Sequence, residues 1–247
     1  MDKNRVYGEK IPIHMEKVQS FYNKRASLIA QKGWGAISLG DEDPSIASGT
    51  FDYDRDSVFP KLGVDSNSRV LELGCGMGRW ATIILPHCGV YCGVDFSEEM
   101  LKAAEKICEK YAEKSSFFQL SASEAAEKEP SFYGGAFHCI VLSGLCVHIN
   151  DDELKRIFER LPALAQPHCT ICVKETTAID RRLTLNEFQS EALKSTYNAI
   201  YRTQEEYLAM FQPLLSAEFS IQEQYFLPEA VGRKRAETNS MCTILRR

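Results

Sequence analysis

Residues 70–80 read VLELGCGMGRW, an apolar run that breaks into three glycines spaced two residues apart. Gly74 ends a predicted strand, and Gly74, Gly76 and Gly78 can take positive φ and let the backbone approach a ligand closely. The helix predicted from residue 79 directs its free N–H groups into the same space. The stretch therefore predicts a strand, a ligand-binding turn and a helix.

Asp95 ends the next predicted strand, 21 residues after Gly74. There a carboxylate can accept hydrogen bonds from both hydroxyls of a ribose. The loop reads G-x-G-x-G, and Arg79 stands where a dinucleotide-binding loop has its third glycine, so nothing obvious makes room for a pyrophosphate. Glu72 would repel a phosphate but suit an ammonium group. These features predict a ligand with a ribose, no phosphate and a zwitterionic tail, and S-adenosylmethionine (SAM) has these properties.

Strands and helices alternate from residue 60 onward. The predicted strands are residues 69–73, 90–95, 116–120, 137–143 and 169–175. The predicted helices between them are residues 79–85, 98–112, 123–128 and 151–164. This alternation predicts an α/β fold with a mostly parallel sheet and helices on both faces. Two further β-like runs, residues 219–227 and 241–245, leave no room for a crossover helix and should pair antiparallel.

The regions on either side of this core have other patterns. Residues 14–32 carry apolar side chains at helical spacing, which predicts a helix. A loop rich in Gly, Ser, Asp and Pro is predicted from residue 33 to about residue 54. Residues 184–215 are predicted to be helical, in two pieces.

The composition argues against several classes of function. The 247 residues carry a net charge of -5 with scattered Lys and Arg, which disfavours nucleic acid as a partner. No run of about 18 apolar residues occurs, so we expect a cytoplasmic protein with no membrane segment. Most of the nine cysteines lie in apolar runs and are expected to be reduced core residues. Cys169 and Cys172 would face opposite sides of a strand and could hardly share a metal ion.

From about residue 58 to residue 247, the chain resembles the class I SAM-dependent methyltransferases. VLELGCGMGRW resembles the first motif of that family, GVDFS the second, FHCIVLSGLCVHI the fourth-strand motif and QPHCTICVKE the stretch through strand five. The resemblance implies a Rossmann-like sheet of order 3-2-1-4-5-7-6 with strand seven antiparallel. It also implies a methyltransferase domain over residues 58–247 and a helical lid over residues 1–57.

The same resemblance implies which residues bind the cofactor. At its methionine end it places Glu72, Gly74, Cys75, Gly76 and Gly78. Arg79 would grip the cofactor carboxylate, Asp95 would hold the ribose, and Ser143 is a further cofactor contact. Around the adenine it places Phe96, Met100, Ala122 and Ser123, the last two where many members have an Asp. The lid residues that would cover the cofactor are Tyr22, Arg25 and Trp34.

Two residues are candidates for catalysis. His148 lies just beyond strand four, at the carboxyl edge of the sheet, where a side chain with an ordinary pKa of about 6.5 suits a general base. Its alternative role is to cap the following helix or to bond a loop. Glu175 ends strand five on the same edge and could orient the acceptor, take its proton or attract an amine, or else form a salt bridge. The Asp-Asn pair of metal-dependent members is absent, so no metal is expected.

The acceptor wall is predicted in the helical segment of residues 178–215. Its aromatic and cationic candidates are Arg181, Arg182, Phe188, Tyr197, Tyr201 and Arg202. We expect methyl transfer to an O or N atom of a small-molecule acceptor, such as a sugar or a sugar nucleotide, by a monomer or homodimer. GMGRW and HINDDEL also resemble protein N-terminal methyltransferases, so a peptide amine is an alternative acceptor. A SAM-binding protein without turnover is a further alternative.

Overall fold

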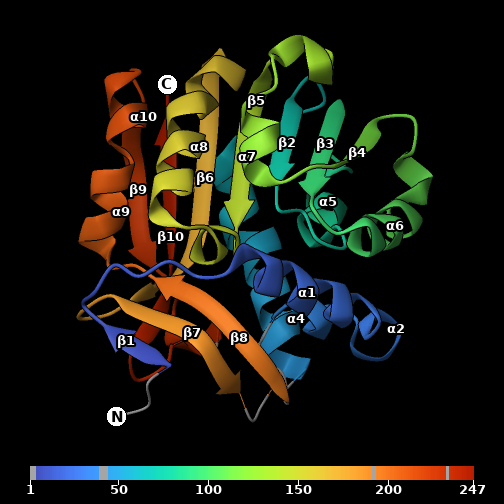
Figure 1. The fold of residues 1–247 in the computed structure, drawn as a ribbon. Helices are drawn as coiled ribbons and strands as arrows, with labels where there is room; N and C mark the ends of the chain where they lie inside the picture. Colours follow the sequence, from blue (N-terminus) through green and yellow to red (C-terminus); the bar gives the residue numbers. More distant parts are fainter. Residues whose placement is uncertain (1–3, 39–43, 191–192, 232–233) are drawn as a thin grey trace.

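The computed structural model describes residues 4–38, 44–190, 193–231 and 234–247, and a seven-stranded sheet forms its centre (Figure 1). The strands are β2 (Arg69–Leu73), β3 (Val90–Asp95), β4 (Ser115–Gln119), β5 (Phe137–Ser143), β6 (Ala165–Ala178), β9 (Ser220–Phe226) and β10 (Thr238–Arg246). Their order is β4-β3-β2-β5-β6-β10-β9, in which β10 runs antiparallel to β6 and β9 and the other neighbours are parallel. The predicted order, with strand seven antiparallel, is confirmed.

Helices cover both faces of this sheet because successive residues of a strand point to opposite sides. On one face, Leu71 and Ile140 belong to a buried cluster that also holds Phe158. The helices of that face are α7 (Ala122–Ala126), α8 (Asp151–Leu164), α9 (Gln204–Met210) and α10 (Gln212–Ser216). On the other face, Val70 packs in a cluster with Trp80. The elements of that face include α5 (Arg79–Ile84) and the 3-10 helix η2 (Phe59–Leu62).

The amino-terminal region agrees with the prediction only in part. The elements before η2 are β1 (Arg5–Tyr7), α1 (Met15–Ala26), α2 (Ile29–Lys32), α3 (Gly35–Ser38), α4 (Pro44–Tyr53) and the π-helix η1 (Asp54–Val58). The helix predicted over residues 14–32 is thus confirmed as two consecutive helices. The loop predicted for residues 33–54 is wrong for its described part, which is mostly helical. The buried side of α4 and η1 carries polar residues, since Thr50 and Asp54 are both buried. The sequence therefore lacks the apolar spacing that would have predicted these helices.

The helix predicted over residues 184–215 is wrong for more than half of its length. β7 (Leu183–Ser190) pairs antiparallel with β8 (Ser195–Tyr201) and with β1, which gives a second, three-stranded sheet in the order β1-β7-β8. Helix begins only at α9, where the Thr203 side chain accepts a hydrogen bond from the N–H of Glu206. The β-branched and aromatic residues of β8 favour a strand, and the strand places alternate side chains on a buried face.

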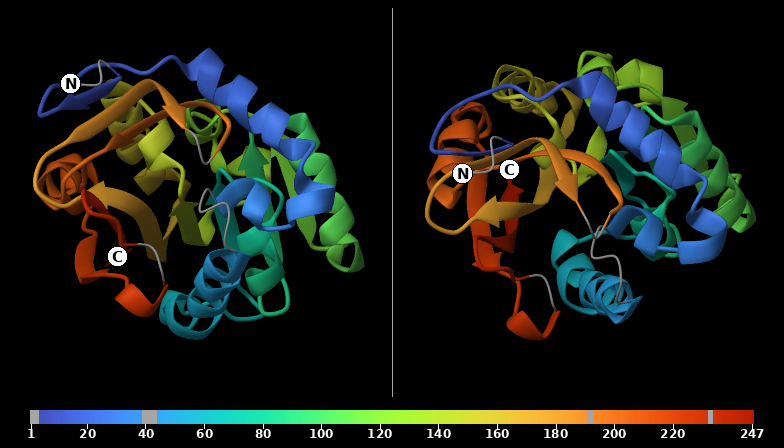
Figure 2. Two further views of the ribbon diagram at one scale, coloured as in Figure 1. Left: turned by 90° about the horizontal axis from the view of Figure 1, so that it is seen from below. Right: turned by 60° about the horizontal axis from the view of Figure 1, so that its bottom comes forward.

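The small sheet and α1 lie across the carboxyl ends of the parallel strands (Figures 1 and 2). Phe21 of α1 and Tyr197 of β8 contact each other with ring centroids 5.4 Å apart. Both residues pack in one cluster with Val147, which follows β5. Residues from the two ends of the chain therefore cover the edge where open α/β sheets bind their ligands.

Candidate active site

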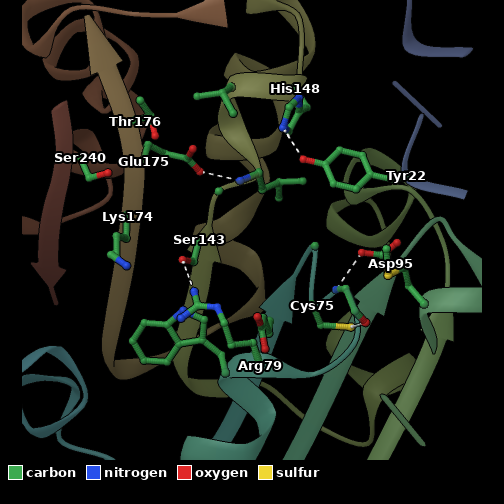
Figure 3. A pocket seen from close by; sticks show the side chains of 18 of the residues that line it. Tyr22, Cys75, Arg79, Asp95, Ser143, His148, Lys174, Glu175, Thr176 and Ser240 are labelled. Atoms are coloured by element: carbon green, nitrogen blue, oxygen red, sulfur yellow. Dashed lines mark hydrogen bonds between the residues drawn. The ribbon is translucent and has the colours of Figure 1, made fainter. Parts of the chain in front are cut away.

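A pocket lies at the covered carboxyl edge of the seven-stranded sheet (Figure 3). Its walls come from the loops after β2, β3 and β5, the end of β6, and parts of α1, α4, β8 and β10. The residues predicted from the sequence that line it are Tyr22, Glu72, Gly74, Cys75, Gly76, Arg79, Asp95, Phe96, Met100, Ser143, His148 and Glu175. Most of the predicted site residues therefore meet in one cavity.

The glycine loop needs glycine for two reasons. Gly74, Gly76 and Gly78 have φ of 74°, 53° and 85°, in the left-handed region that favours glycine. A Cβ on Gly74 would lie 2.8 Å from Cδ1 of Leu145, so this position also lacks space for a side chain. Gly74 and Gly76 line the pocket. Gly78 does not, and a Cβ there would meet Cβ of Ala104 in α6 (Glu98–Ile107) at 3.2 Å.

Asp95 is held by the loops around it. Its Oδ2 accepts the N–H of Gly76 at 2.9 Å, and its Oδ1 accepts the N–H of Ser97 at 2.9 Å. Burial raises the pKa of the Asp95 carboxyl to about 6, although the hydrogen bonds from these backbone groups lower it. Each oxygen keeps a second lone pair, because a carboxylate has about four acceptor sites. The carboxylate is therefore oriented and still able to accept hydroxyl groups from a ligand.

Glu72 is a buried acid that lines the pocket, and no cation of the described residues forms an ion pair with it. The Tyr91 hydroxyl donates a hydrogen bond to Oε2 of Glu72. Burial raises the pKa of the Glu72 carboxyl to about 8, while the Tyr91 hydrogen bond and the nearby charge of Arg79 lower it. A bound cation would favour the ionised form of this group. Glu72 is thus suited to an ammonium group of a ligand.

Asp54 joins two cations of the pocket wall. Its carboxylate, which is fully buried, forms ion pairs with Arg79 and with Lys174, the latter at 2.6 Å. The two cations hold the pKa of Asp54 below its usual range, although burial, the largest influence on this group, raises it. Arg79 also donates to Oγ of Ser143 at 3.4 Å, as Figure 3 shows. The residue predicted to grip a ligand carboxylate therefore lies at the pocket with a fixed orientation.

His148 and Tyr22 form a hydrogen-bonded pair at the other side of the pocket (Figure 3). The Nδ1 atom of His148 lies 3.1 Å from the carbonyl oxygen of Asn198, which can only accept, so Nδ1 carries the proton. Nε2 is then the acceptor for the Tyr22 hydroxyl, at 2.8 Å. Burial lowers the pKa of His148 to about 4 and raises that of Tyr22 well above its usual range. At neutral pH both groups are uncharged, and Tyr22 is the donor.

Glu175 ends the parallel run of β6 with one oxygen bonded and one not. Oε1 accepts the N–H groups of Leu145 and Cys146, each at 2.8 Å. Oε2 is buried and has no hydrogen-bond partner among the described residues. Burial raises the pKa of Glu175 to about 7, against the hydrogen bonds from the 145–147 backbone that lower it. Lys174, which precedes Glu175 in the chain, forms an ion pair with Asp54.

Five predicted site residues lie outside the pocket lining: Arg25, Trp34, Gly78, Ala122 and Ser123. Arg25 is buried and donates to the carbonyl oxygens of Ala36 and Gly35. Trp34 stacks on Phe51 with ring centroids 5.8 Å apart. The Ser123 hydroxyl donates to Glu153 of α8.

Several lining residues escaped the sequence analysis: Thr50, Lys174, Thr176 and Ser240. Tyr197 and Tyr201 also line the pocket, but from a strand instead of the predicted helix. The arginines predicted beside them do not. Arg182 and Arg202 are buried and pair with Asp151, at 2.8 and 2.7 Å. The polar side chains of the unpredicted lining residues were the only signal in the sequence, and nothing in it indicated that they lie at the same pocket.

The parts of the chain that the structure describes contain no group of three or more His, Cys, Asp or Glu side chains placed to hold a metal ion. None of the helices described is both long and apolar enough to cross a membrane. The nine cysteines are buried and free, as predicted.

Comparisons with known proteins agree with this geometry. A family model described as a methyltransferase domain matches residues 71–171. No curated protein matches the chain. Similar solved structures include a SAM-dependent methyltransferase from Leishmania major, with 15% identity and a TM-score of 0.65 over 96% of this chain and 88% of that one.

Two further similar structures contain the product S-adenosylhomocysteine (SAH). Phosphoethanolamine N-methyltransferase 1 from Haemonchus contortus has 14% identity and a TM-score of 0.71 over 94% of this chain and 49% of that one. The 1,6-didemethyltoxoflavin-N1-methyltransferase from Burkholderia thailandensis has 17% identity and a TM-score of 0.63 over 100% and 97%. A methyltransferase-domain model thus matches residues 71–171, and the fold is the one found in class I SAM-dependent methyltransferases. The resemblance carried by the sequence motifs is confirmed.

Proposed function

We propose that the chain transfers the methyl group of SAM to an O or N atom of a small-molecule acceptor and releases SAH. One observation carries this proposal. The glycine loop and Asp95 line the same pocket as Glu175, Tyr22 and His148. A cofactor held by the first set would therefore meet an acceptor held by the second.

The side chains of the pocket fit the parts of SAM. The Asp95 carboxylate can accept the ribose hydroxyls, and Glu72 offers a buried carboxyl for the ammonium group. Arg79 offers a guanidinium for the carboxylate, in a position fixed by Asp54. Phe96 and Met100 line the pocket beside Asp95, where they would flank the adenine. When bound, SAM supplies a methyl group that is activated by a sulfonium leaving group.

The protein mainly has to align the acceptor. Positioning of this kind can supply roughly 7–11 kcal/mol of barrier reduction. A general base adds roughly 10²–10⁴ in rate. Glu175 is the better placed base, because its Oε2 has no hydrogen-bond partner in the described part of the chain and its pKa of about 7 is close to neutral pH. Both ring nitrogens of His148 are engaged, by the Tyr22 hydroxyl and by the carbonyl oxygen of Asn198, so we assign His148 to holding the Tyr22 hydroxyl in the pocket.

The acceptor end suits a small polar molecule. Its walls carry the hydroxyl groups of Thr176, Tyr197, Tyr201 and Ser240, which can bond a sugar. The sequence suggested a sugar nucleotide because arginines were expected to line the acceptor site. Arg182 and Arg202 instead pair with Asp151 and do not line the pocket. We therefore favour a small polar molecule without a phosphate group.

Two measurements test the proposal. Isothermal titration should show that both SAM and SAH bind, and that Gly76→Val or Asp95→Ala abolishes or strongly weakens binding. Methyl transfer from labelled SAM should then be measured to sugars, sugar nucleotides and a peptide with a free amino terminus. Transfer to the peptide alone would favour the protein N-terminal activity. Binding of both compounds without transfer to any acceptor would favour a protein without turnover.

A further inference from the structure

Glu175 has no ion-pair partner among the residues that the structure describes, and it lies in a pocket that holds other acids. Three carboxyls line this pocket, those of Glu72, Asp95 and Glu175. The lining cations are Arg79 and Lys174, and both form ion pairs with the carboxylate of Asp54. The zwitterionic tail of SAM can satisfy Glu72 and Arg79. In SAH, which lacks the sulfonium charge of SAM, nothing remains to balance the carboxylate of Glu175 at the acceptor end.

The geometry of Glu175 points to a ligand that donates a hydrogen bond. Its side chain is only 2% exposed, and the carboxylate is anchored through Oε1 by two backbone N–H groups. Oε2 has no partner among the residues that the structure describes. A buried carboxylate oxygen without a partner is costly, so a donor with a positive charge would stabilise it most.

Aromatic rings stand at the same end of the pocket. The rings of Tyr22 and Tyr197 contact His148 in T-shaped arrangements, with centroids 5.1 and 5.6 Å from it, and Tyr201 also lines the cavity. His148 itself carries no charge at neutral pH, because its burial lowers its pKa. Aromatic faces attract cations and not anions. The surroundings of Glu175 therefore favour a positively charged acceptor over a neutral one, and disfavour an anion.

We propose that the acceptor end of this pocket is a subsite for a protonated amine, with Glu175 as its counter-ion and proton acceptor. This assignment rests on the methyl transfer proposed above and narrows it to nitrogen. The ammonium group donates to Oε2 and then gives it one proton. The amine lone pair forms the new N–C bond to the methyl group as the S–C bond breaks, and the sulfur keeps that electron pair. The product is an N-methylammonium ion, and Glu175 returns its proton to water as the product leaves.

The test uses the complex of the full chain with SAH, in which no sulfonium competes for Glu175. Isobutylammonium, isobutanol and isobutyrate are probes of similar size that differ in charge, and their binding can be followed by ligand-observed NMR. We expect the ammonium to bind at least tenfold tighter than the alcohol, and the carboxylate not to bind. Glu175→Gln should remove the preference for the ammonium. Its amide oxygen can still accept both backbone N–H groups, and its amide nitrogen replaces the oxygen without a partner.

Each outcome decides one question. Glu159→Gln, at an exposed position of α8, is the matched control and should behave as the wild type. Failure of the wild type to bind SAH would overturn the proposed function itself. If SAH binds but the alcohol or the carboxylate binds as tightly as the ammonium, or no probe binds, the amine subsite is wrong. The amine subsite is also wrong if Glu175→Gln keeps the preference for the ammonium probe. It is wrong as well if the only effect of this variant is to weaken the binding of SAM relative to that of SAH. Should Glu175→Gln not fold, the order of the three probes on the wild type decides alone.

Discussion

The hydroxyl of Tyr22 in α1 lies 2.8 Å from Nε2 of His148, which follows β5 126 residues later in the chain. Because Nδ1 of His148 is committed to the carbonyl oxygen of Asn198, the Tyr22 proton must point at Nε2. This contact ties the amino-terminal helix to the carboxyl edge of the sheet. It also leaves the lone pairs of the Tyr22 oxygen directed away from the histidine, at the pocket that both residues line.

Tyr22→Phe and His148→Asn should therefore impair the same function. We expect each to lower kcat/KM for the acceptor by about tenfold, the loss of one hydrogen bond that orients a reacting molecule. The double variant should be no worse than either single variant, because the two residues act as a unit. Tyr111→Phe, which is outside the pocket lining, is the control. A fall of 10²–10⁴ in kcat for His148→Asn alone would instead make His148 the general base.

The central sheet could be predicted because its strands are buried on both faces. Apolar runs such as VLEL and CIVL predict buried strands without further context. The short link between β9 and β10 has no room for a crossover helix, so antiparallel pairing is expected. The β7–β8 pair could not be recognised in the same way. Tyr197 and Tyr201 are four residues apart, and this spacing places two side chains on one face of a helix and also of a strand. The sequence of Leu183–Ser190 likewise does not favour a strand over a helix.

The site was predictable where chain order determines position. Glu72, Asp95 and Glu175 lie where the parallel pairing of their strands ends, and the carboxyl ends of such strands meet at one edge. Asp54 was not predictable, because it belongs to a polar stretch and approaches Arg79 and Lys174 only through tertiary packing. The cofactor roles predicted for Ala122 and Ser123 stay predictions, since the ligand-free pocket does not include these residues.

Asp54→Asn should destabilise the protein strongly. Asp54 balances Arg79 and Lys174 inside the protein, and removing one partner of a buried ion pair costs about 3–5 kcal/mol. Urea unfolding followed by circular dichroism measures this free energy. Asp56→Asn is the matched control, because Asp56 is exposed and pairs only with Arg55 at the surface. Equal midpoints for the wild type and Asp54→Asn would show that the buried cluster contributes nothing to stability.

The ligand-free protein should become less stable as the pH rises from about 6.5 to 8. Burial raises the pKa of Glu72 from 4.5 to about 8, so in this window the folded state keeps a proton that the unfolded state has lost. The contribution of Glu72 to the free energy of unfolding is fully present below about pH 4.5. It declines by up to about 1.4 kcal/mol per pH unit between pH 4.5 and about pH 8. Glu175 acts in the same direction up to about pH 7. His148 acts in the opposite direction, but only below about pH 6.5.

Thermal melts at constant ionic strength measure this dependence. Glu72→Gln should flatten the curve between pH 7 and 8, because the amide has no proton to lose. A wild-type melting temperature that stays constant or rises over this window would contradict the raised pKa of Glu72.

Arg79→Gln should weaken the binding of SAH but not that of 5′-methylthioadenosine, which has the same nucleoside and no amino-acid tail. Arg79 lies at the pocket with Ser143 and Asp54, where it is suited to the tail carboxylate. Losing a charge-assisted hydrogen bond costs about 1.5–3 kcal/mol, which corresponds to roughly a 10- to 150-fold rise in Kd. Arg79→Lys should recover part of the affinity for SAH, because it keeps the charge but not the planar fork. Isothermal titration of both compounds gives the comparison. An equal loss for SAH and methylthioadenosine would mean that Arg79 shapes the pocket as a whole and does not bind the carboxylate.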